Sequence, residues 1–278
     1  MEVVRFSDAA AFLERAVHWL MQAEVENNVI LGLAGSIADG SRTLKEPPYF
    51  AAALDRGAVV ACAARTPPHK LLVSRGTATA LASLAADAFD AFGQLPGVNG
   101  PMEASAGFAR AWARLTGAPG RVSMRLRIHA AVDVADDLPV CRGELREATA
   151  AERNLAVEWT AAFAREALPE PPSDPEGTID RLMKARSLYF WVDRHPVTMC
   201  GSGGRTVNGA RVGPVYTPRE FRGRGHATAA VAELTRRLLG GAAYCCLYTD
   251  LANPTSNSIY RRIGYRPICD VDEYAFVR

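Results

Sequence analysis

The chain alternates between two spacings of apolar residues, and this alternation predicts a mixed α/β protein. An extended apolar run over residues 210–217 ends at Pro218, which has no N–H to donate to a sheet ladder. From Gly223 onward, apolar residues recur every three or four positions, which predicts a long helix. The positions that show this spacing are Ala230, Val231, Leu234, Leu238 and Leu239.

The same order of elements is predicted twice along the chain: strand, two helices, three strands, helix, strand, helix and strand. The first copy covers residues 1–135 and the second covers residues 143–278. Charge and proline interrupt the pattern within residues 133–142, so we place a domain boundary there. In the second copy, Thr149 followed by Glu152 indicates a capping box that opens a helix. We therefore expect two tandem domains, each with a mixed, largely antiparallel sheet flanked by helices.

Between the strand and the long helix lies Arg222-Gly223-Arg224-Gly225-His226-Ala227, an R-x-x-G-x-A turn. Small residues let a ligand approach the backbone, and the first turn of a helix presents unpaired N–H groups with a positive partial charge. Such a turn suits a pyrophosphate, and Arg222 and Arg224 add charge-assisted donors. Glycine-rich turns before helices are common, however, so the turn alone is a weak indication of a phosphate site.

The residues that follow make the pattern more specific. A strand predicted over residues 244–249 leads to Asn253-Pro254-Thr255-Ser256-Asn257-Ser258-Ile259-Tyr260, an N-x-x-x-N-x-x-Y motif, and then to Gly264-Tyr265. Together with Thr217-Pro218 and the R-x-x-G-x-A turn, these motifs stand in the order found in the GNAT superfamily of acyl-CoA-dependent N-acetyltransferases. Residues 143–278 therefore resemble that superfamily, and the resemblance implies a GNAT-like fold.

The resemblance also implies a cofactor-binding site for acetyl-CoA, which serves as the acyl donor. In the superfamily, the strand that matches Val215, Tyr216 and Thr217 pairs with the pantetheine arm, and a main-chain N–H there polarises the thioester carbonyl. The pyrophosphate site corresponds to Arg222, Gly223, Arg224, Gly225, His226, Ala227 and Thr228. The implied activity is transfer of an acetyl group to a primary amine by direct attack in a ternary complex.

Three residues of the N-x-x-x-N-x-x-Y motif complete the implied site. Asn253 and Asn257 match residues near the cofactor, and Tyr260 matches the residue that lies near the sulfur and protonates the departing thiolate as a general acid. Each also has a purely structural interpretation, because asparagine before proline is a normal helix start and Tyr260 can pack a helix against the sheet. No metal is expected.

The general base is not identified by the sequence. The candidates are Asp250 at a strand end, Glu158 on a helix, and a chain of water molecules, and we assign none. For the acceptor, the loop of the second half carries Glu166, Glu170, Asp174 and Glu176 among Pro169, Pro171 and Pro172. Stiffly held carboxylates at the mouth of a cleft would concentrate cations. This predicts a primary amine with further positive charge, on a small molecule or a lysine side chain, although acidic loops are also common on ordinary surfaces.

The first half matches these motifs only in outline. Arg75-Gly76-Thr77-Ala78-Thr79-Ala80 stands in the place of the R-x-x-G-x-A turn, but alanine replaces the inner glycine and the second arginine is missing. Phe108, the aromatic residue nearest to the position of Tyr260, has no hydroxyl. We therefore expect a degenerate copy that binds no acyl-CoA, so that the second half carries the activity.

Two other functions are alternatives to an acyltransferase. A dinucleotide-binding fold is excluded for two reasons. Thr228 occupies the third glycine or alanine position of the G-x-G-x-x-G/A motif, and a single βα crossover follows it, too few for a doubly wound sheet. A non-catalytic acyl-CoA-binding regulatory module stays open, and release of CoA in the presence of amines distinguishes it from an enzyme.

Composition limits the remaining function classes. The net charge of +2 argues against nucleic-acid binding, and no apolar stretch is long enough to span a membrane. The stretch over residues 1–6 contains Glu2 and no long apolar segment, so no signal peptide is predicted. The six cysteines form no C-x-x-C motif and mostly stand in apolar runs, which favours buried thiols. We expect a cytoplasmic protein of undetermined oligomeric state.

Overall fold

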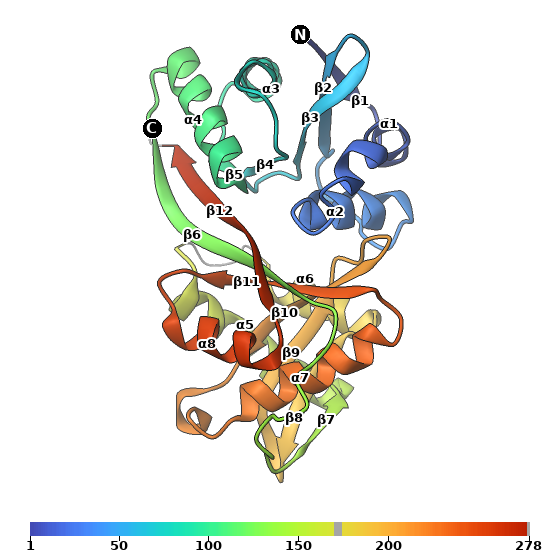
Figure 1. Ribbon diagram of the computed structural model, residues 1–278, viewed down its shortest axis with the longest axis vertical. Helices are drawn as coiled ribbons and strands as arrows, with labels where there is room; N and C mark the ends of the chain where they lie inside the picture. Colours follow the sequence, from blue (N-terminus) through green and yellow to red (C-terminus); the bar gives the residue numbers. More distant parts are fainter. Residues whose placement is uncertain (170–173, 277–278) are drawn as a thin grey trace.

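The computed structural model describes residues 1–169 and 174–276 and contains an N-terminal lobe, a C-terminal lobe and two long strands that join them (Figure 1). The elements of the N-terminal lobe are β1 (Glu2–Phe6), α1 (Ala9–Met21), α2 (Asn28–Ala38), β2 (Tyr49–Asp55), β3 (Ala58–Arg65), β4 (Leu71–Val73), α3 (Ala78–Phe92), β5 (Gly97–Pro101) and α4 (Met102–Thr116). The first joining strand, β6 (Gly120–Ala131), follows.

The C-terminal lobe lies below the first in Figure 1. Its elements are β7 (Glu144–Glu147), the 3-10 turn η1 (Ala150–Glu152), α5 (Arg153–Ala167), α6 (Pro175–Lys184), β8 (Leu188–Asp193), β9 (His195–Gly203), β10 (Gly209–Tyr216), the 3-10 turn η2 (Arg219–Phe221), α7 (His226–Leu239), β11 (Tyr244–Asp250) and α8 (Pro254–Ile263). The second joining strand, β12 (Arg266–Phe276), completes the described chain.

Local sequence signals account for several of these boundaries. Asp8 caps α1 by accepting a hydrogen bond from the Ala11 backbone N–H at 2.9 Å. The predicted capping box is present, since Glu152 accepts from the Thr149 N–H at 2.8 Å. Arg146 also binds the Glu152 carboxylate at 2.7 Å and, as the largest cause, lowers the pKa of Glu152 to about 2.

Each lobe has helices on both faces of its part of the sheet. In the N-terminal lobe, α1 and α2 bury Phe12 on one face, and α3 and α4 bury Trp112 on the other. In the C-terminal lobe, α5 and α6 bury Ile179, while α7 and α8 enclose Leu234. Burying an apolar side chain of this size stabilises the fold by about 1.5–3 kcal/mol. These clusters therefore hold the layers together.

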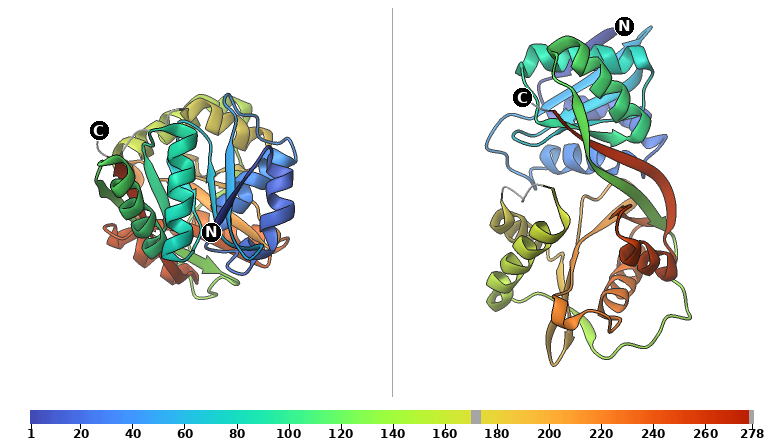
Figure 2. Two further views of the ribbon diagram at one scale, coloured as in Figure 1. Left: turned by 90° about the horizontal axis from the view of Figure 1, so that it is seen from above. Right: turned by 90° about the vertical axis from the view of Figure 1, so that its left-hand side faces the viewer.

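The two lobes share one sheet because they exchange strands. Over the described residues the sheet has twelve strands, in the order β1-β2-β3-β4-β5-β12-β6-β11-β10-β9-β8-β7. The strand β6 follows the N-terminal lobe in sequence but pairs with β11 of the C-terminal lobe, and β12 follows the C-terminal lobe but pairs with β5 of the N-terminal lobe. Both long strands cross between the lobes side by side (Figure 2).

An ion pair also links the two long strands β6 and β12. Arg127 on β6 donates two hydrogen bonds to the Asp270 carboxylate on β12, at 2.6 and 2.9 Å. Paired Arg–carboxylate bonds of this kind also fix orientation. Because β12 returns to the N-terminal lobe and pairs with β5, both ends of the described chain lie at that lobe, as Figure 1 shows.

The predicted fold class, a mixed and largely antiparallel sheet in two tandem halves, is confirmed. The predicted order of elements is also observed in both halves. Helix α7 begins at His226, three residues later than Gly223, because the glycines of the turn adopt left-handed backbone angles. The domain boundary within residues 133–142 stays a prediction, and the sheet continues across it.

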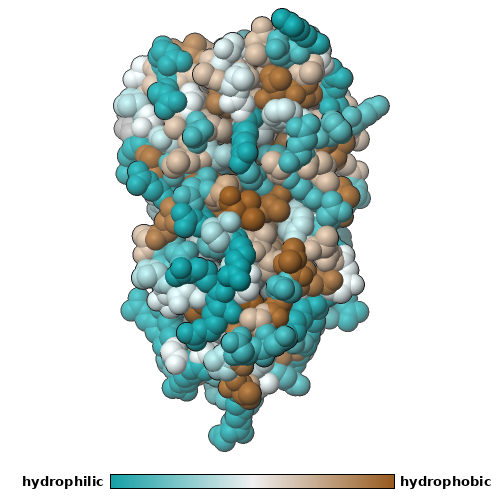
Figure 3. Space-filling model, viewed as in Figure 1, coloured by the Kyte–Doolittle hydropathy of each residue, from teal (hydrophilic) through white to brown (hydrophobic). Residues whose placement is uncertain are grey.

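The surface and the helices add two observations. Polar and apolar residues are interspersed over the face seen in Figure 3, and the molecule narrows between the lobes.

Within residues 1–169 and 174–276, no helix combines the length and apolar character needed to cross a membrane.

Candidate active site

The predicted pyrophosphate turn has the geometry of an anion site. Gly223 and Gly225 have φ angles of +75° and +82°, which side chains other than glycine rarely adopt. Gly225 is the N-cap of α7 and provides no side-chain cap, so the first N–H groups of the helix remain available. The stretch from Arg222 to Gly225 is exposed. A phosphate group can therefore reach these N–H groups directly.

Strands β10 and β11 diverge in front of this turn. They pair in parallel only from Gly209–Tyr244 to Arg211–Cys246, and the ladder between β10 and β9 shifts between Val212 and Val215. Beyond this point β11 continues to pair with β6, so the end of β10 has a free edge on that side. An extended chain of amides can pair with such an edge as an added strand.

The side chains at the end of β10 point to both faces of the sheet. Val215 packs in the cluster under α7, together with Ala229 and Tyr260. Tyr216 instead packs under α5, where its hydroxyl donates to Glu166 at 3.0 Å. Thr217 shares a hydrogen bond of 2.9 Å with Thr198. These three side chains are therefore engaged within the protein, and their role in binding pantetheine stays a prediction.

The two arginines of the turn differ in their surroundings. Arg222 donates to Glu166 at 2.8 Å and to the Thr217 carbonyl at 2.8 Å, which ties the turn to α5 and β10. This guanidinium is the largest cause of the lowered pKa of Glu166. Arg224 is exposed and makes no ion pair with a described residue. Arg224 is thus the arginine that is more available to a phosphate.

His226 is turned away from the predicted phosphate position. Its ring is buried, and Nδ1 lies 3.3 Å from the Sγ atom of Cys141 in the connection between the lobes. Burial lowers the pKa of His226 and raises that of Cys141. At the start of α7, a ligand therefore meets the backbone N–H groups of His226, Ala227 and Thr228.

The two asparagines have structural hydrogen bonds. Asn253 is the N-cap of α8 and accepts from the Ser256 N–H at 3.1 Å. The Asn257 amide donates to the carbonyls of Asp250 and Asn253 at 3.0 and 2.8 Å, and its oxygen accepts from the Thr249 hydroxyl at 2.7 Å. Asn257 therefore fastens α8 to the end of β11, and its role in cofactor binding stays a prediction.

Tyr260 lies on α8, near the end of β10. Its ring packs against Tyr265, with centroids 6.1 Å apart, in the cluster that also contains Val215. Its hydroxyl forms no hydrogen bond with a described residue. The role of Tyr260 as proton donor stays a prediction. Burial, followed by the electrostatic effect of Cys200, raises the pKa of Tyr260 to about 12. Since Cys200 pairs with Val215 in the sheet, Tyr260 lies close to the end of β10.

The candidate general bases are not distinguished. Asp250 accepts from the Ala252 N–H at 2.8 Å as a turn residue, and Glu158 is exposed on α5. His129 on β6 lies against Thr249, with 3.5 Å between its Nδ1 atom and the threonine Oγ1 atom. Strand exchange thus places a residue of the first half beside α8, which its position in the sequence gave no reason to expect.

The corresponding positions of the N-terminal lobe are arranged differently. Thr77 caps α3 with its own side chain, which accepts from the Ala80 N–H at 3.2 Å. A side chain at Gly100 would meet the Val73 carbonyl at 2.5 Å, so β4 and β5 stay in close contact there. Phe108 is fully buried in the core. These three features agree with a degenerate copy.

The described carboxylates of the predicted acidic loop have partners within the protein. Glu166 and Glu176 belong to α5 and α6 rather than to the loop. Glu166 is bound by Arg222 and Tyr216, Asp174 accepts from the Gly177 N–H at 2.9 Å as the N-cap of α6, and Glu176 pairs with an arginine at 3.2 Å. Glu170, Pro171 and Pro172 lie outside the described residues. The preference for a cationic acceptor stays a prediction. In the described part of the chain, no group of three or more His, Cys, Asp or Glu side chains has the arrangement of a metal site.

Comparisons with known proteins identify the fold. Residues 193–277 match the family model of the FR47-like proteins. A search of curated protein sequences finds no significant match. A GNAT-family acetyltransferase from Colwellia psychrerythraea superposes with a TM-score of 0.61 at 10% identity, over 100% of both chains. A GCN5-related N-acetyltransferase from Sphaerobacter thermophilus gives a TM-score of 0.59 at 18% identity, over 98% of this chain and 94% of that one.

A tandem arrangement is also found among the similar structures. A tandem GNAT protein from the clavulanic acid biosynthesis pathway superposes with a TM-score of 0.58 at 14% identity, over 99% of this chain and 98% of that one. The chain thus has the GNAT acetyltransferase fold in a tandem arrangement. More particularly, the part of its second half that is similar to the FR47-like family model is residues 193–277.

Proposed function

We propose that the protein is an N-acyltransferase that moves an acetyl group from acetyl-CoA to a primary amine by direct attack in a ternary complex. The observation that supports this most strongly is the divergence of β10 and β11 in front of the uncapped start of α7. Tyr260 packs in the same cluster as Val215, so the proposed proton donor adjoins this opening.

Each part of the proposed site has one task. The first N–H groups of α7 bind the pyrophosphate, and the free edge of β10 holds the pantetheine amides. Acetyl-CoA supplies an acetyl group already activated as a thioester. A backbone N–H near Val215 stabilises negative charge on the carbonyl oxygen during attack. The Tyr260 hydroxyl, which keeps its proton at neutral pH, transfers it to the departing thiolate.

The decisive experiment combines thiol release with thermal stability. The wild-type protein should release CoA from acetyl-CoA in the presence of a suitable amine, and CoA should raise its melting temperature by mass action. Ala227→Glu places a negative charge in the first turn of α7, where it favours the helix but repels a pyrophosphate. This variant should keep its own stability and lose the CoA-dependent shift.

The N-terminal lobe offers a matched control. Ala78 is an exposed residue in the first turn of α3, the helix that corresponds to α7, and Ala78→Glu introduces the same charge there. The control should retain both the CoA-dependent shift and thiol release. Equal CoA-dependent shifts in Ala227→Glu and Ala78→Glu would refute the proposed site. A CoA-dependent shift without thiol release with any amine would favour a non-catalytic acyl-CoA-binding module instead.

A further inference from the structure

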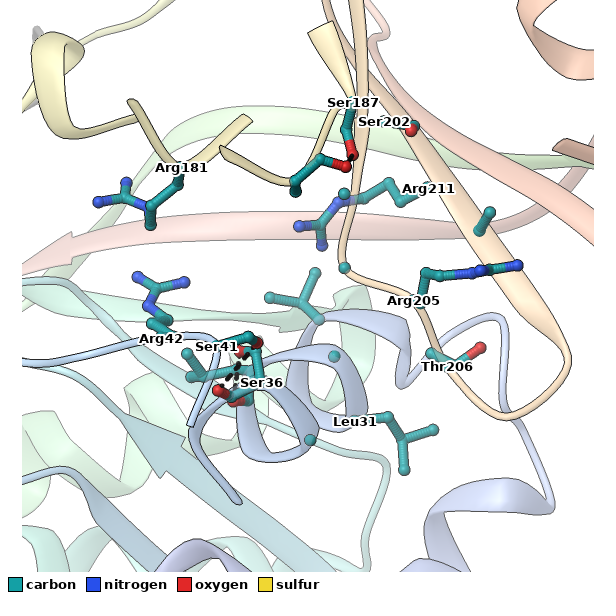
Figure 4. Close-up of a pocket in the computed structure, with 18 of the residues that line it drawn as sticks. Leu31, Ser36, Ser41, Arg42, Arg181, Ser187, Ser202, Arg205, Thr206 and Arg211 are labelled. Atoms are coloured by element: carbon teal, nitrogen blue, oxygen red, sulfur yellow. Dashed lines mark hydrogen bonds between the residues drawn. The ribbon is translucent and has the colours of Figure 1, made fainter. Parts of the chain in front are cut away.

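An open cavity of about 1520 Å³ lies between the two lobes. The N-terminal lobe lines it with α1, α2 and the segment after α2, and the C-terminal lobe lines it with α6, the end of β9 and β10. Figure 4 shows side chains from both lobes directed into this space. The cavity is therefore composite, because neither lobe encloses it alone.

Three arginines converge on the cavity. Arg42 follows α2, Arg181 belongs to α6, and Arg211 belongs to β10. In Figure 4 the guanidinium groups of Arg42 and Arg181 face each other across a gap, and that of Arg211 points toward the same space. Burial, followed by the like charges of Arg181 and Arg211, lowers the pKa of Arg42. The positive charge of Arg42 is thus repelled by those of Arg181 and Arg211.

The described carboxylates do not neutralise this group. Arg42 makes no ion pair with a described residue, and Arg211 donates only to the neutral Asn28 side chain at 3.3 Å. Arg181 lies 3.7 Å from Asp174, at a solvent-exposed position where such a pair contributes little. Glu14 and Asp39 also line the cavity but form no ion pair with the three arginines. Arg42 and Arg211 therefore have no carboxylate partner among the described residues, and such guanidinium groups in a cavity favour an anionic ligand.

The cavity borders the point at which transfer is proposed. Arg211, Gly213 and Pro214 of β10 line it, and Val215 is the next residue in the strand. Ala210 and Val212 pack under α7, so Arg211, which alternates with them, points to the opposite face of the sheet. Arg211 therefore reaches the cavity from the face of β10 opposite to α7, while Arg237 and Leu238 at the end of α7 line the cavity as well.

Hydrogen bonds hold the lobes in this arrangement. Glu24 accepts from the Asn208 backbone and side chain at 2.8 and 2.9 Å, and Asn28 donates to the Tyr248 hydroxyl at 2.9 Å. A side chain on Gly32 would meet the Gly204 backbone at 3.0 Å, so α2 and the end of β9 approach closely. The position of Arg42 relative to Arg181 and Arg211 is therefore fixed by the contact between the lobes.

We propose that this cavity is the acceptor site and that Arg42, Arg181 and Arg211 bind a carboxylate or phosphate group of the acceptor amine. This inference rests on the proposed acyltransferase function. The acceptor then carries its reacting amine and its anionic group on one small molecule. The N-terminal lobe, which has no acyl-CoA site of its own, contributes Arg42 to substrate recognition.

The first test compares amines that differ only in the anionic group. Thiol release is measured with β-alanine against propylamine, with phosphoethanolamine against ethanolamine, and with putrescine as a cationic amine. The anionic member of at least one pair should be preferred, and the pair that responds distinguishes a carboxylate from a phosphate. Arg42→Gln should raise KM for that acceptor about tenfold to a hundredfold, while kcat and the KM for acetyl-CoA change little.

A second variant and a stability measurement separate recognition from structure. Arg205 lines the same cavity but donates to the Gly241 carbonyl at 3.0 Å and lies apart from the three arginines in Figure 4. Arg205→Gln should leave the acceptor KM nearly unchanged. Arg42→Gln should not lower the melting temperature, since it removes a charge repelled by its neighbours. With saturating CoA present, inorganic phosphate should stabilise the wild-type protein but not Arg42→Gln.

The outcomes distinguish this inference from the function on which it rests. Thiol release confined to neutral or cationic amines would overturn the anionic acceptor and leave the acyltransferase intact. Absence of thiol release with every amine would overturn the acceptor role together with the proposed function. In that case the phosphate measurement decides whether the arginines bind an anion. If phosphate raises the melting temperature of the wild-type protein and of Arg42→Gln equally, anion binding by the arginines is overturned as well.

Discussion

Tyr260→Phe should reduce turnover without reducing stability. The substitution removes the proposed proton donor and keeps the ring that packs against Tyr265. General acid catalysis contributes about a hundredfold to ten-thousandfold, so kcat should fall by a factor in that range. Because the Tyr260 hydroxyl makes no hydrogen bond with a described residue, its loss should leave the melting temperature nearly unchanged.

Tyr265→Phe is the matched control in the same cluster. The Tyr265 hydroxyl is buried and lies 2.7 Å from the Thr235 hydroxyl. Losing this hydrogen bond should cost about 0.5–1.5 kcal/mol, and leaving the Thr235 hydroxyl without that partner adds to the cost. For a chain of this size, 1 kcal/mol corresponds to about 2–4 °C in melting temperature. Tyr265→Phe should therefore lower the melting temperature by a few degrees and leave kcat close to the wild-type value.

The assay is thiol release under conditions in which the chemical step limits the rate, together with calorimetric melting of both variants. The pH dependence gives a further check, because an ordinary tyrosine would begin to lose its proton near pH 10. With a pKa of about 12, Tyr260 should produce no decline in kcat below about pH 11. Unchanged kcat in Tyr260→Phe, or equal loss of kcat in both variants, would show that the Tyr260 hydroxyl is not the general acid.

Three further predictions concern binding and stability. Titration calorimetry should give one CoA per chain, because Thr77 caps α3 and Gly100 keeps β4 and β5 together, and two equivalent sites would contradict this. The lowered pKa of Glu152 contributes stability that is present above about pH 4.5 and lost as the pH falls toward 2, so Glu152→Gln should flatten the acid dependence measured by urea unfolding. An unaltered slope would disprove that role. Thermal unfolding should be one cooperative transition, because β6 and β12 join the lobes, and two resolved transitions would show that the lobes unfold independently.

The parts of the structure that sequence could predict depend on local signals. The turn before α7 follows from glycines at positions with positive φ, and the start of α5 follows from the Thr149 and Glu152 capping box. Both arise within a few residues of the chain. The start of α3 is also set locally, because Thr77 caps the helix with its own side chain.

The exchange of strands could not be predicted in this way. The residues of β6 and β12 have the spacing of extended segments whichever lobe they join, and pairing depends on contacts between residues more than one hundred positions apart. A period of two specifies which side chains share a face and says nothing about the neighbouring strand. The position of His129 beside Thr249 was hidden for the same reason.

The prediction of a cationic acceptor interpreted charges along the sequence, whereas their partners are set in space. Glu166 lies in the last turn of α5, and Arg222, fifty-six positions later, binds it at 2.8 Å. Arg42, Arg181 and Arg211 come from a loop, a helix and a strand, and each alone is typical of a solvated surface. One signal was present in the sequence, since Arg211 lies inside an apolar strand whose opposite face is buried.

The relation between the lobes explains why a copy without an acyl-CoA site can remain necessary. The N-terminal lobe binds β12, and β6 in turn provides the neighbour of β11 on the side away from β10. Without β6, β11 would have an unpaired edge beside the site, and such edges are prone to unwanted pairing. Under the proposed acceptor site, the same lobe also supplies Arg42. The first half can therefore support the second through strand pairing, and under the proposal through Arg42, without binding acyl-CoA itself.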